Sequence, residues 1–281
     1  MVKKILTLIL AFCMVFSITA CGKDTEPSAV SSEKSEIREN FTNEDTKYSS
    51  NKVNVGEKIS AYKNTLELRE EKDESTGYVN VFADIDGESE PLLLFQNSEG
   101  LVDCYMIDSG KIAYVIAQAN FMDHETKDTW YALQLIRLSE NGVSQTNTID
   151  GKLVDKPVDG MTEFNIRSEV GFCGYQEADR TYYIQENYLI PKESTYRYVN
   201  KQKISPLKDI TFTTTAGENL SYKTGDELYI TAIDIADEDD SVKNIVYMED
   251  STGKSFKIEY TYEYFEMRIN NENVEQLFSY E

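Results

Sequence analysis

Residues 111–138 read KIAYVIAQANFMDHETKDTWYALQLIRL, and this stretch decides the fold class. Lys111–Gln118 and Trp130–Leu138 follow a period of two and are rich in β-branched and aromatic residues. Such a pattern is typical of β-strands, because successive side chains of a strand point to opposite faces. The polar segment Asn120–Thr129, which contains His124, separates the two runs. The stretch therefore predicts a β-hairpin.

Runs of the same kind continue on both sides of this hairpin, over a β-rich domain expected at 53–215. The other predicted strands are Thr65–Arg69, Tyr78–Asp84, Leu92–Gln96, Leu101–Ile107, Glu163–Arg167, Thr181–Gln185, Thr195–Asn200 and Ile210–Thr215. Turn residues such as Asp86-Gly87 and Asp150-Gly151 separate them. Short strands with only five prolines predict a mainly β protein of antiparallel sheets, arranged as a sandwich, a barrel or a partial propeller. No long internal repeat is evident.

A second, smaller β domain is expected at 216–281. After Ala216-Gly217, the strands Glu227–Ile235, Asn244–Glu249 and Ser255–Thr261 follow one another, and Asn273–Tyr280 is expected to close the domain as a short helix. This order resembles the small Src-homology-type barrels of bacterial envelope proteins. The resemblance implies a small C-terminal β-barrel. The chain lacks the Gly-Trp pair that bacterial members carry after the last turn.

The charge of the chain limits its partners. Lys and Arg number 28 against 50 Asp and Glu, which gives a formal net charge of −22. So acidic a surface repels phosphate backbones, and we expect no nucleic-acid partner. The single histidine, His124, excludes metal sites built from several histidines, and its polar loop predicts a surface position. No nucleophile motif accompanies it.

The first 22 residues carry a targeting signal. Lys3 and Lys4 precede an apolar run of 14 residues, Ile5–Ile18, which as a helix would span about 21 Å and is too short for a membrane span. The following Ile-Thr-Ala-Cys-Gly, residues 18–22, resembles the bacterial lipoprotein lipobox. The resemblance implies a signal peptide at 1–20 and lipidation of Cys21. The alternative is an ordinary cleaved signal with an incidental cysteine.

This resemblance also implies a location and a partner. Residues 21–52 are polar and are expected to be a disordered spacer behind the lipidated cysteine. Two acyl chains on Cys21 would hold the protein on the outer face of a Gram-positive-type cell membrane. The expected partners are that membrane and either a cell-wall glycan or an envelope protein.

An acidic turn in the β-rich domain resembles a calcium loop. Phe82–Leu94 reads FADIDGESEPLLL, similar to the Asp-x-Asp-Gly loop of FG-GAP or VCBS-type proteins. The resemblance implies Asp84, Asp86 and Glu88 as calcium ligands, since carboxylates at alternate positions converge on one hard cation. Ser89 replaces the glycine of the family pattern. The alternative is a hairpin turn with solvated acids and no cofactor.

Cysteines and tyrosines leave further alternatives open. Cys104 and Cys173 are expected either to form one disulfide outside the cytoplasm or to be two buried thiols. Two groups of tyrosines, one at 182–198 and one at 260–264, either fill the core or form an exposed binding row. The leading functional hypothesis is a non-catalytic binding or structural lipoprotein. The alternative is an envelope polysaccharide hydrolase that uses paired carboxylates.

Overall fold

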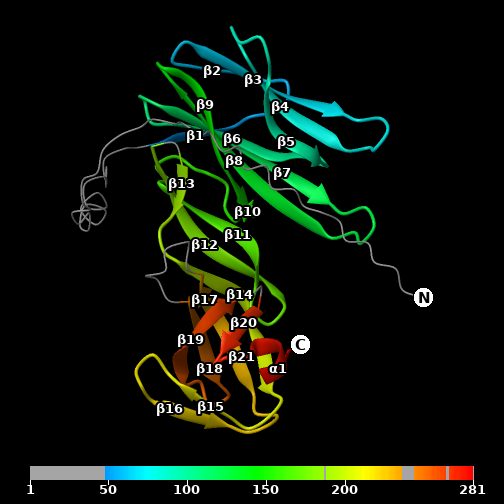
Figure 1. Cartoon of the computed structure of the whole chain (residues 1–281). Helices are drawn as coiled ribbons and strands as arrows, with labels where there is room; N and C mark the ends of the chain where they lie inside the picture. Colours follow the sequence, from blue (N-terminus) through cyan, green and yellow to red (C-terminus); the bar gives the residue numbers. More distant parts are fainter. Residues whose placement is uncertain (1–47, 187, 236–243, 264–265, 281) are drawn as a thin grey trace, which may run out of the picture. The chain divides into compact units, whose positions relative to one another are not determined.

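The computed structural model describes residues 48–281 except positions 187, 236–243, 264–265 and 281 (Figure 1). Almost all of its regular structure is β-strand, and α1, Val274–Leu277, is the one helix in this described part. The predicted mainly β, antiparallel fold is confirmed. The predicted signal segment 1–20, Cys21 and most of the predicted spacer lie outside the described residues.

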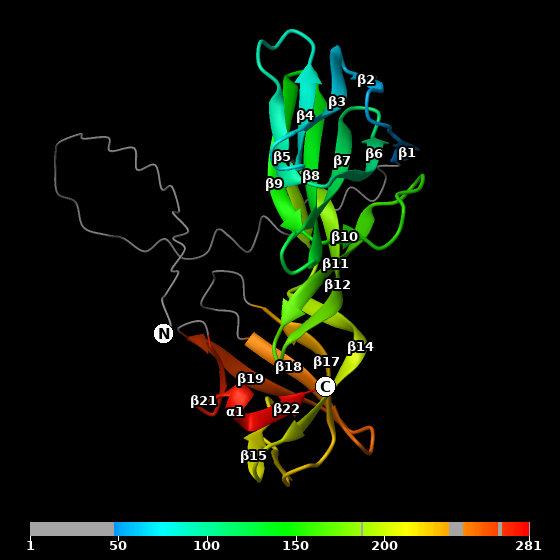
Figure 2. The ribbon, with the colours of Figure 1, turned by 90° about the vertical axis from the view of Figure 1, so that its right-hand side faces the viewer.

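Two four-stranded antiparallel meanders form two layers in the first half of the described chain (Figure 2). The first consists of β2 (Lys58–Ala61), β3 (Asn64–Lys72), β4 (Val79–Ile85) and β5 (Leu92–Ser98). The second consists of β6 (Gly100–Asp108), β7 (Ala113–Met122), β8 (Thr129–Ser139) and β9 (Gly142–Asp150), with β1 (Ser49–Lys52) beside β6. The predicted hairpin is therefore β7–β8. The end of the predicted spacer forms β1.

Strand β7 is buried on both faces. Ala113, Val115 and Ala117 pack with side chains of the first meander, such as Leu68, in one hydrophobic cluster. The alternate residues, including Ile116, point the other way into a second cluster. A strand covered on both faces reads as a nearly continuous apolar run, which explains the sequence of this segment. Full burial of a side chain such as Ile116 contributes about 1.5–3 kcal/mol.

A third meander covers the other face of the β6–β9 layer. Its strands are β10 (Lys152–Leu153), β11 (Glu163–Gly171), β12 (Tyr175–Gln185) and β13 (Tyr188–Pro191). Phe164, Ile166 and Tyr182 of this meander pack with Ile116 and Leu135 of the second. The three meanders therefore form three layers. One hydrophobic cluster joins the first layer to the second, and another joins the second to the third, as in a sandwich.

The remaining strands extend the sheet of the third meander. β14 (Thr195–Pro206) pairs with β12, and β17 (Leu228–Asp234), β18 (Asn244–Asp250), β19 (Ser255–Glu263), β20 (Glu266–Ile269) and β21 (Glu272–Asn273) follow in order. β15 (Ile210–Thr213) and β16 (Asn219–Tyr222) form a separate hairpin that spans residue 216. Since β17 pairs with β14, strands on both sides of the predicted boundary share one sheet. Independent folding of 216–281 stays a prediction.

The C-terminal region differs from its prediction in two ways. No sheet among the described strands closes into a barrel, so the small barrel does not form there. The predicted helix Asn273–Tyr280 is one turn, Val274–Leu277, followed by strand β22, Phe278–Tyr280, which pairs with β14. The strand buries Phe278 in the C-terminal cluster while its backbone pairs with β14, which a longer helix would not allow.

A repeated loop joins the middle strands of the first two meanders. In the loop 73–78, Asp73 Oδ1 accepts hydrogen bonds from the amides two and three residues later, at 2.7 and 3.2 Å. In the loop 123–128, Asp123 Oδ1 accepts the same two bonds, at 2.7 and 3.1 Å. The two aspartates are 50 positions apart in the chain. The recurring feature is a local backbone pattern with few shared residues, so it is compatible with a sequence that shows no long repeat.

Candidate functional site

The outer end of the β7–β8 hairpin presents the only tryptophan of the chain. Trp130 is 45% exposed and lies opposite Phe121 in the register of the hairpin. The two rings stack with centroids 5.6 Å and planes 10° apart. Phe121 in turn contacts the buried ring of Phe95 edge-on at 6.1 Å. A row of rings therefore leads from the core to the surface and fixes the orientation of the exposed indole.

Uncharged polar side chains follow Trp130 along the same face. Gln134 is four residues further along β8, so both side chains lie on one side of the sheet, about 14 Å apart along the strand. The Gln134 Nε2 group donates a hydrogen bond to Thr148 Oγ1 at 2.9 Å, and Gln134 Oε1 accepts one from Gln145 Nε2. We call Trp130, Gln145 and Thr148 the Trp130 surface; Gln134, at 5% exposed, is buried and holds the last two side chains. The hydrogen bond between the Gln134 and Gln145 amides fixes the orientation of both side chains.

The Trp130 surface has a charged neighbour on its face, the exposed Asp150 of β9, which lies opposite Ala132. Residues 129–136 of β8 and 142–149 of β9 contain no charged side chain. The whole chain carries a formal charge of −22. The sequence analysis did not single out these residues. A long stretch without charges in a chain with 28% charged residues is the signal that would have drawn attention to them.

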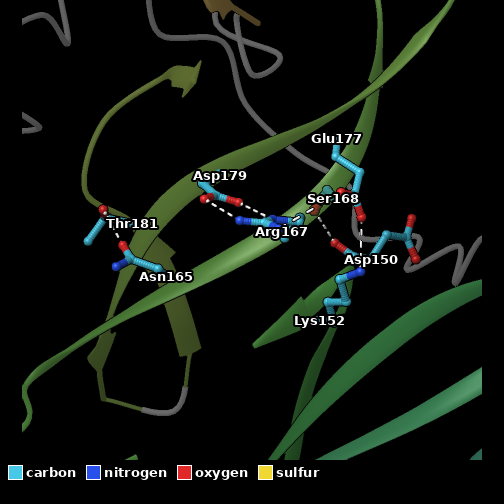
Figure 3. A network of polar contacts seen from close by, with 8 residues as sticks. All are labelled: Asp150, Lys152, Asn165, Arg167, Ser168, Glu177, Asp179 and Thr181. Carbon is cyan, nitrogen blue, oxygen red and sulfur yellow. Dashed lines mark hydrogen bonds and ion pairs between the residues drawn. The ribbon is translucent and has the colours of Figure 1, made fainter. Parts of the chain in front are cut away.

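The outward face of β10–β12 has the opposite character, with charges paired in a network (Figure 3). Arg167 binds Asp179 through two hydrogen bonds of 2.7 and 3.0 Å and lies 3.8 Å from Glu177. Lys152 contacts Glu177 at 2.9 Å, and Thr181 donates to Asn165 at 2.8 Å. Two carboxylates thus share a strand face, but a cation already binds each. The outward side chains of β11 and β12 are therefore polar and bind one another, while the inward ones are apolar.

The predicted calcium ligands form a hairpin turn. Asp84 lies on β4, where Arg69 Nε donates to its carboxylate at 2.9 Å. Asp86 and Glu88 lie in or beside the turn, in which Gly87 takes a φ of +93°. Across the described residues, no three Asp, Glu, His or Cys side chains are grouped as a metal ion would require. Calcium binding by Asp84, Asp86 and Glu88 therefore stays a prediction without support from this geometry.

The two remaining cysteines are separate buried thiols. Cys104 belongs to the cluster between the first two meanders, and Cys173 belongs to the C-terminal cluster. Burial raises the pKa of both thiols to about 12. The disulfide alternative is thus corrected, because the chain buries these sulfurs in different parts of the core.

The tyrosine groups are largely structural. Tyr182, Tyr198 and Tyr260 are buried in hydrophobic clusters. Tyr188 and Tyr262 are exposed, at 49% and 55%, and Tyr264 lies outside the described residues. Tyr260 and Tyr262 share a strand face as predicted, but only one of them is covered, so no continuous exposed row forms.

His124 lies on the surface, as the sequence predicted. Its Nε2 atom is 2.7 Å from Glu99 Oε1, and its ring stacks on the ring of Tyr78. A carboxylate and an aromatic ring are therefore its neighbours, and neither is a nucleophile that it would activate. Through these contacts, His124 links the loop 123–128 to Tyr78 of the loop 73–78 and to Glu99.

Acidic side chains occupy two sheltered places among the described residues. A hollow of about 370 Å³ near β1 and β2 is lined by one acid, Glu57, which bonds to Asn54. Asp234 is the one buried carboxylate among the described residues, and it accepts hydrogen bonds from Thr195 at 2.5 Å and Tyr247 at 2.9 Å. Neither feature brings two acids face to face, as glycoside hydrolysis requires.

Comparisons with family models, with curated proteins and with solved structures found no match to this chain. In the part of the chain that the structure describes, no helix has the length and apolar character needed to cross a membrane. The candidate site therefore depends on the geometry of the Trp130 surface alone.

Proposed function

We propose that this chain is a lipid-anchored, extracytoplasmic binding protein without catalytic activity. The observation that carries the binding role is the exposed Trp130 ring, held by Phe121, with the exposed polar side chains of Thr148 and Asp150 on the same face of the sheet. A rigid ring next to oriented polar groups is typical of binding sites, because little conformational freedom is lost when a partner binds.

The proposed location rests on the segment that resembles a lipobox. Cys21 would carry two acyl chains, which provide the two-signal anchoring that a single chain does not. The net charge of −22 would keep the folded part away from an anionic membrane surface. The partner would be a cell-wall glycan or an envelope protein.

The state of the described carboxylates supports binding over hydrolysis. The acids that share the face of β12, Glu177 and Asp179, are ion-paired with Lys152 and Arg167. A hydrolase needs one acid that holds a proton and a second that remains ionised. Both of these carboxylates are already bound by a cation on the strand face, so neither is free to face a second acid across a substrate.

Metabolic labelling tests the anchoring directly. Cells that express the chain are grown with radioactive palmitate, and the protein is isolated and counted. We expect label in the natural protein and none in Cys21→Ala, while the control variant Cys13→Ala keeps its label. An unlabelled natural protein would contradict the lipid anchor.

A second experiment tests the binding role. Substitution of Trp130 by a photo-crosslinking amino acid, with the same substitution at Tyr188 as control, should attach envelope material only at position 130. Equal attachment at both positions would contradict a binding role for this surface.

A further inference from the structure

We propose that the Trp130 surface binds a neutral sugar chain. This inference rests on the proposed function and names its ligand class. A sugar ring offers one face of C–H groups and a rim of hydroxyls, so it needs an exposed aromatic ring beside hydrogen-bonding groups. Trp130 supplies the ring, and Gln145 and Thr148 supply an amide and a hydroxyl group, both held by hydrogen bonds to Gln134, which is only 5% exposed.

The orientation of the ring suits stacking. Phe121 covers one face of the indole at a nearly parallel angle of 10°. With 45% of Trp130 exposed, the indole keeps surface for a second flat group. Since Phe95 supports Phe121 from the core, the indole is held before a ligand arrives, and less entropy is lost on binding.

The spacing points to a chain of sugars rather than to one ring. Trp130 and Gln134 are about 14 Å apart along β8. Thr148 lies directly across from Gln134 on β9 and is exposed. One sugar unit would stack on the indole while a later unit would reach the Thr148 hydroxyl, and the exposed carboxylate of Asp150, which lies between them on the same face, would accept hydrogen bonds from sugar hydroxyls.

The charge of the molecule selects against acidic polymers. A protein of net charge −22 repels a polyanion at long range. The residues of β8 and β9 around the Trp130 surface add no positive charge that would offset this repulsion. A neutral chain pays no such penalty, so we infer a neutral glycan in preference to an anionic one.

Intrinsic fluorescence reads this site directly, because Trp130 is the only tryptophan of the chain. The full-length protein is titrated with cellohexaose, maltohexaose and chitohexaose. We expect a saturable change in tryptophan emission with at least one of them, at the millimolar level that a shallow site with few contacts would give. No saturable change with any of the three would overturn the proposal.

Variants separate a specific site from a general effect. In affinity gel electrophoresis with a polymer of the responding sugar, Trp130→Ala should bind at least about tenfold more weakly, a loss of about 1.4 kcal/mol. Trp130→Phe should keep part of the affinity, and Thr148→Val should weaken it about threefold. Tyr188→Ala, which removes a ring of similar exposure on β13, should bind like the natural protein.

The outcomes distinguish this inference from the function it rests on. Retardation of Trp130→Ala equal to that of the natural protein would overturn the sugar site, as would equal losses in Trp130→Ala and Tyr188→Ala. Photo-crosslinking of an envelope protein at position 130, with no fluorescence response to the sugars, would overturn the sugar site but leave the binding role standing. A failure of palmitate labelling would overturn the anchor and leave the sugar result untouched.

Discussion

The ring of His124 lies on the ring of Tyr78, with centroids 4.5 Å and planes 26° apart. The two residues belong to the corresponding loops 123–128 and 73–78 of the second and first meanders. In the connection between the meanders, the Glu99 Oε1 atom lies 2.7 Å from His124 Nε2, within hydrogen-bond distance. Three chain segments far apart in sequence therefore meet, and the loops tie one layer to the other.

The first prediction concerns this stacked pair. Tyr78→Ala should lower the free energy of unfolding by about 0.5–1.5 kcal/mol, the usual contribution of an aromatic pair. Urea unfolding of Tyr78→Ala, His124→Ala and the double variant measures the coupling. The double variant should lose less than the sum of the two single losses. Strict additivity would show that the rings do not stabilise each other.

The second prediction tests the two-sided burial of β7. Ile116 is 0% exposed and packs with Phe164 and Leu135. Ile116→Ala should cost about 2–5 kcal/mol, since it removes buried methyl groups and leaves a cavity. Val158→Ala, at a position 61% exposed, should stay within about 0.5 kcal/mol of the natural protein. Equal losses in chemical denaturation would contradict the layered core.

Strands with apolar runs could be predicted from the sequence, but polar edge strands such as β9 could not. β7 and β8 are covered on both sides, so their apolar residues reveal them. β9 reads GVSQTNTID, which resembles a loop in composition, and it becomes a strand because its backbone pairs with β8. The predicted C-terminal barrel failed for a related reason. Strand order along a chain does not determine whether the last strand returns to the first.

The exposure of Trp130 could not be predicted from the sequence, because exposure depends on the neighbouring layers. The period of two places Trp130, Ala132 and Gln134 on one face, but Ala132 is 4% exposed and Trp130 is 45% exposed. Tyr260 and Tyr262 of β19 differ in the same way. The packing of other strands decides which residues of a strand are covered. The local sequence pattern does not contain this information.

The third prediction compares two glycines with positive φ. Gly151 has a φ of +131°, and a Cβ there would lie 2.5 Å from Ser168 Oγ and 2.6 Å from the Arg167 carbonyl oxygen. Gly87 has a φ of +93° and open space around it. Gly87→Ala should cost about 1–2 kcal/mol from backbone strain alone. Gly151→Ala should cost more than about 3 kcal/mol, because overpacking adds to strain. Similar melting temperatures for both variants would contradict this difference.

The fourth prediction concerns acid. Hydrogen bonds from Ser75 lower the pKa of Asp73, and backbone amides of the loop 123–128 lower the pKa of Asp123. A carboxylate whose pKa is lower in the folded state stabilises the fold above its unfolded pKa, and this contribution is lost as the pH falls through the folded value. Asp73→Asn and Asp123→Asn should therefore lose less stability than the natural protein between about pH 5 and pH 2. Glu88→Gln, in an exposed turn, serves as the control and should follow the natural curve. If the free energy of unfolding of all four proteins fell in parallel with pH, Asp73 and Asp123 would not be the source of this acid sensitivity.

The last prediction concerns alkali. Burial raises the pKa of the Cys104 thiol to about 12, and burial together with the Asp108 hydrogen bond raises the pKa of Tyr62 to about 12. In the unfolded chain these groups lose their protons at lower pH, so between about pH 9 and pH 12 the unfolded state binds fewer protons and stability falls as the pH rises. Cys104→Ala should flatten this fall, whereas Tyr262→Phe, at an exposed position, should leave it unchanged. The same burial should protect Cys104 from Ellman's reagent in the native protein at pH 8 and expose it in urea. Rapid labelling of Cys104 before unfolding would show that the thiol is reached by solvent, and the alkaline slope would then need another cause.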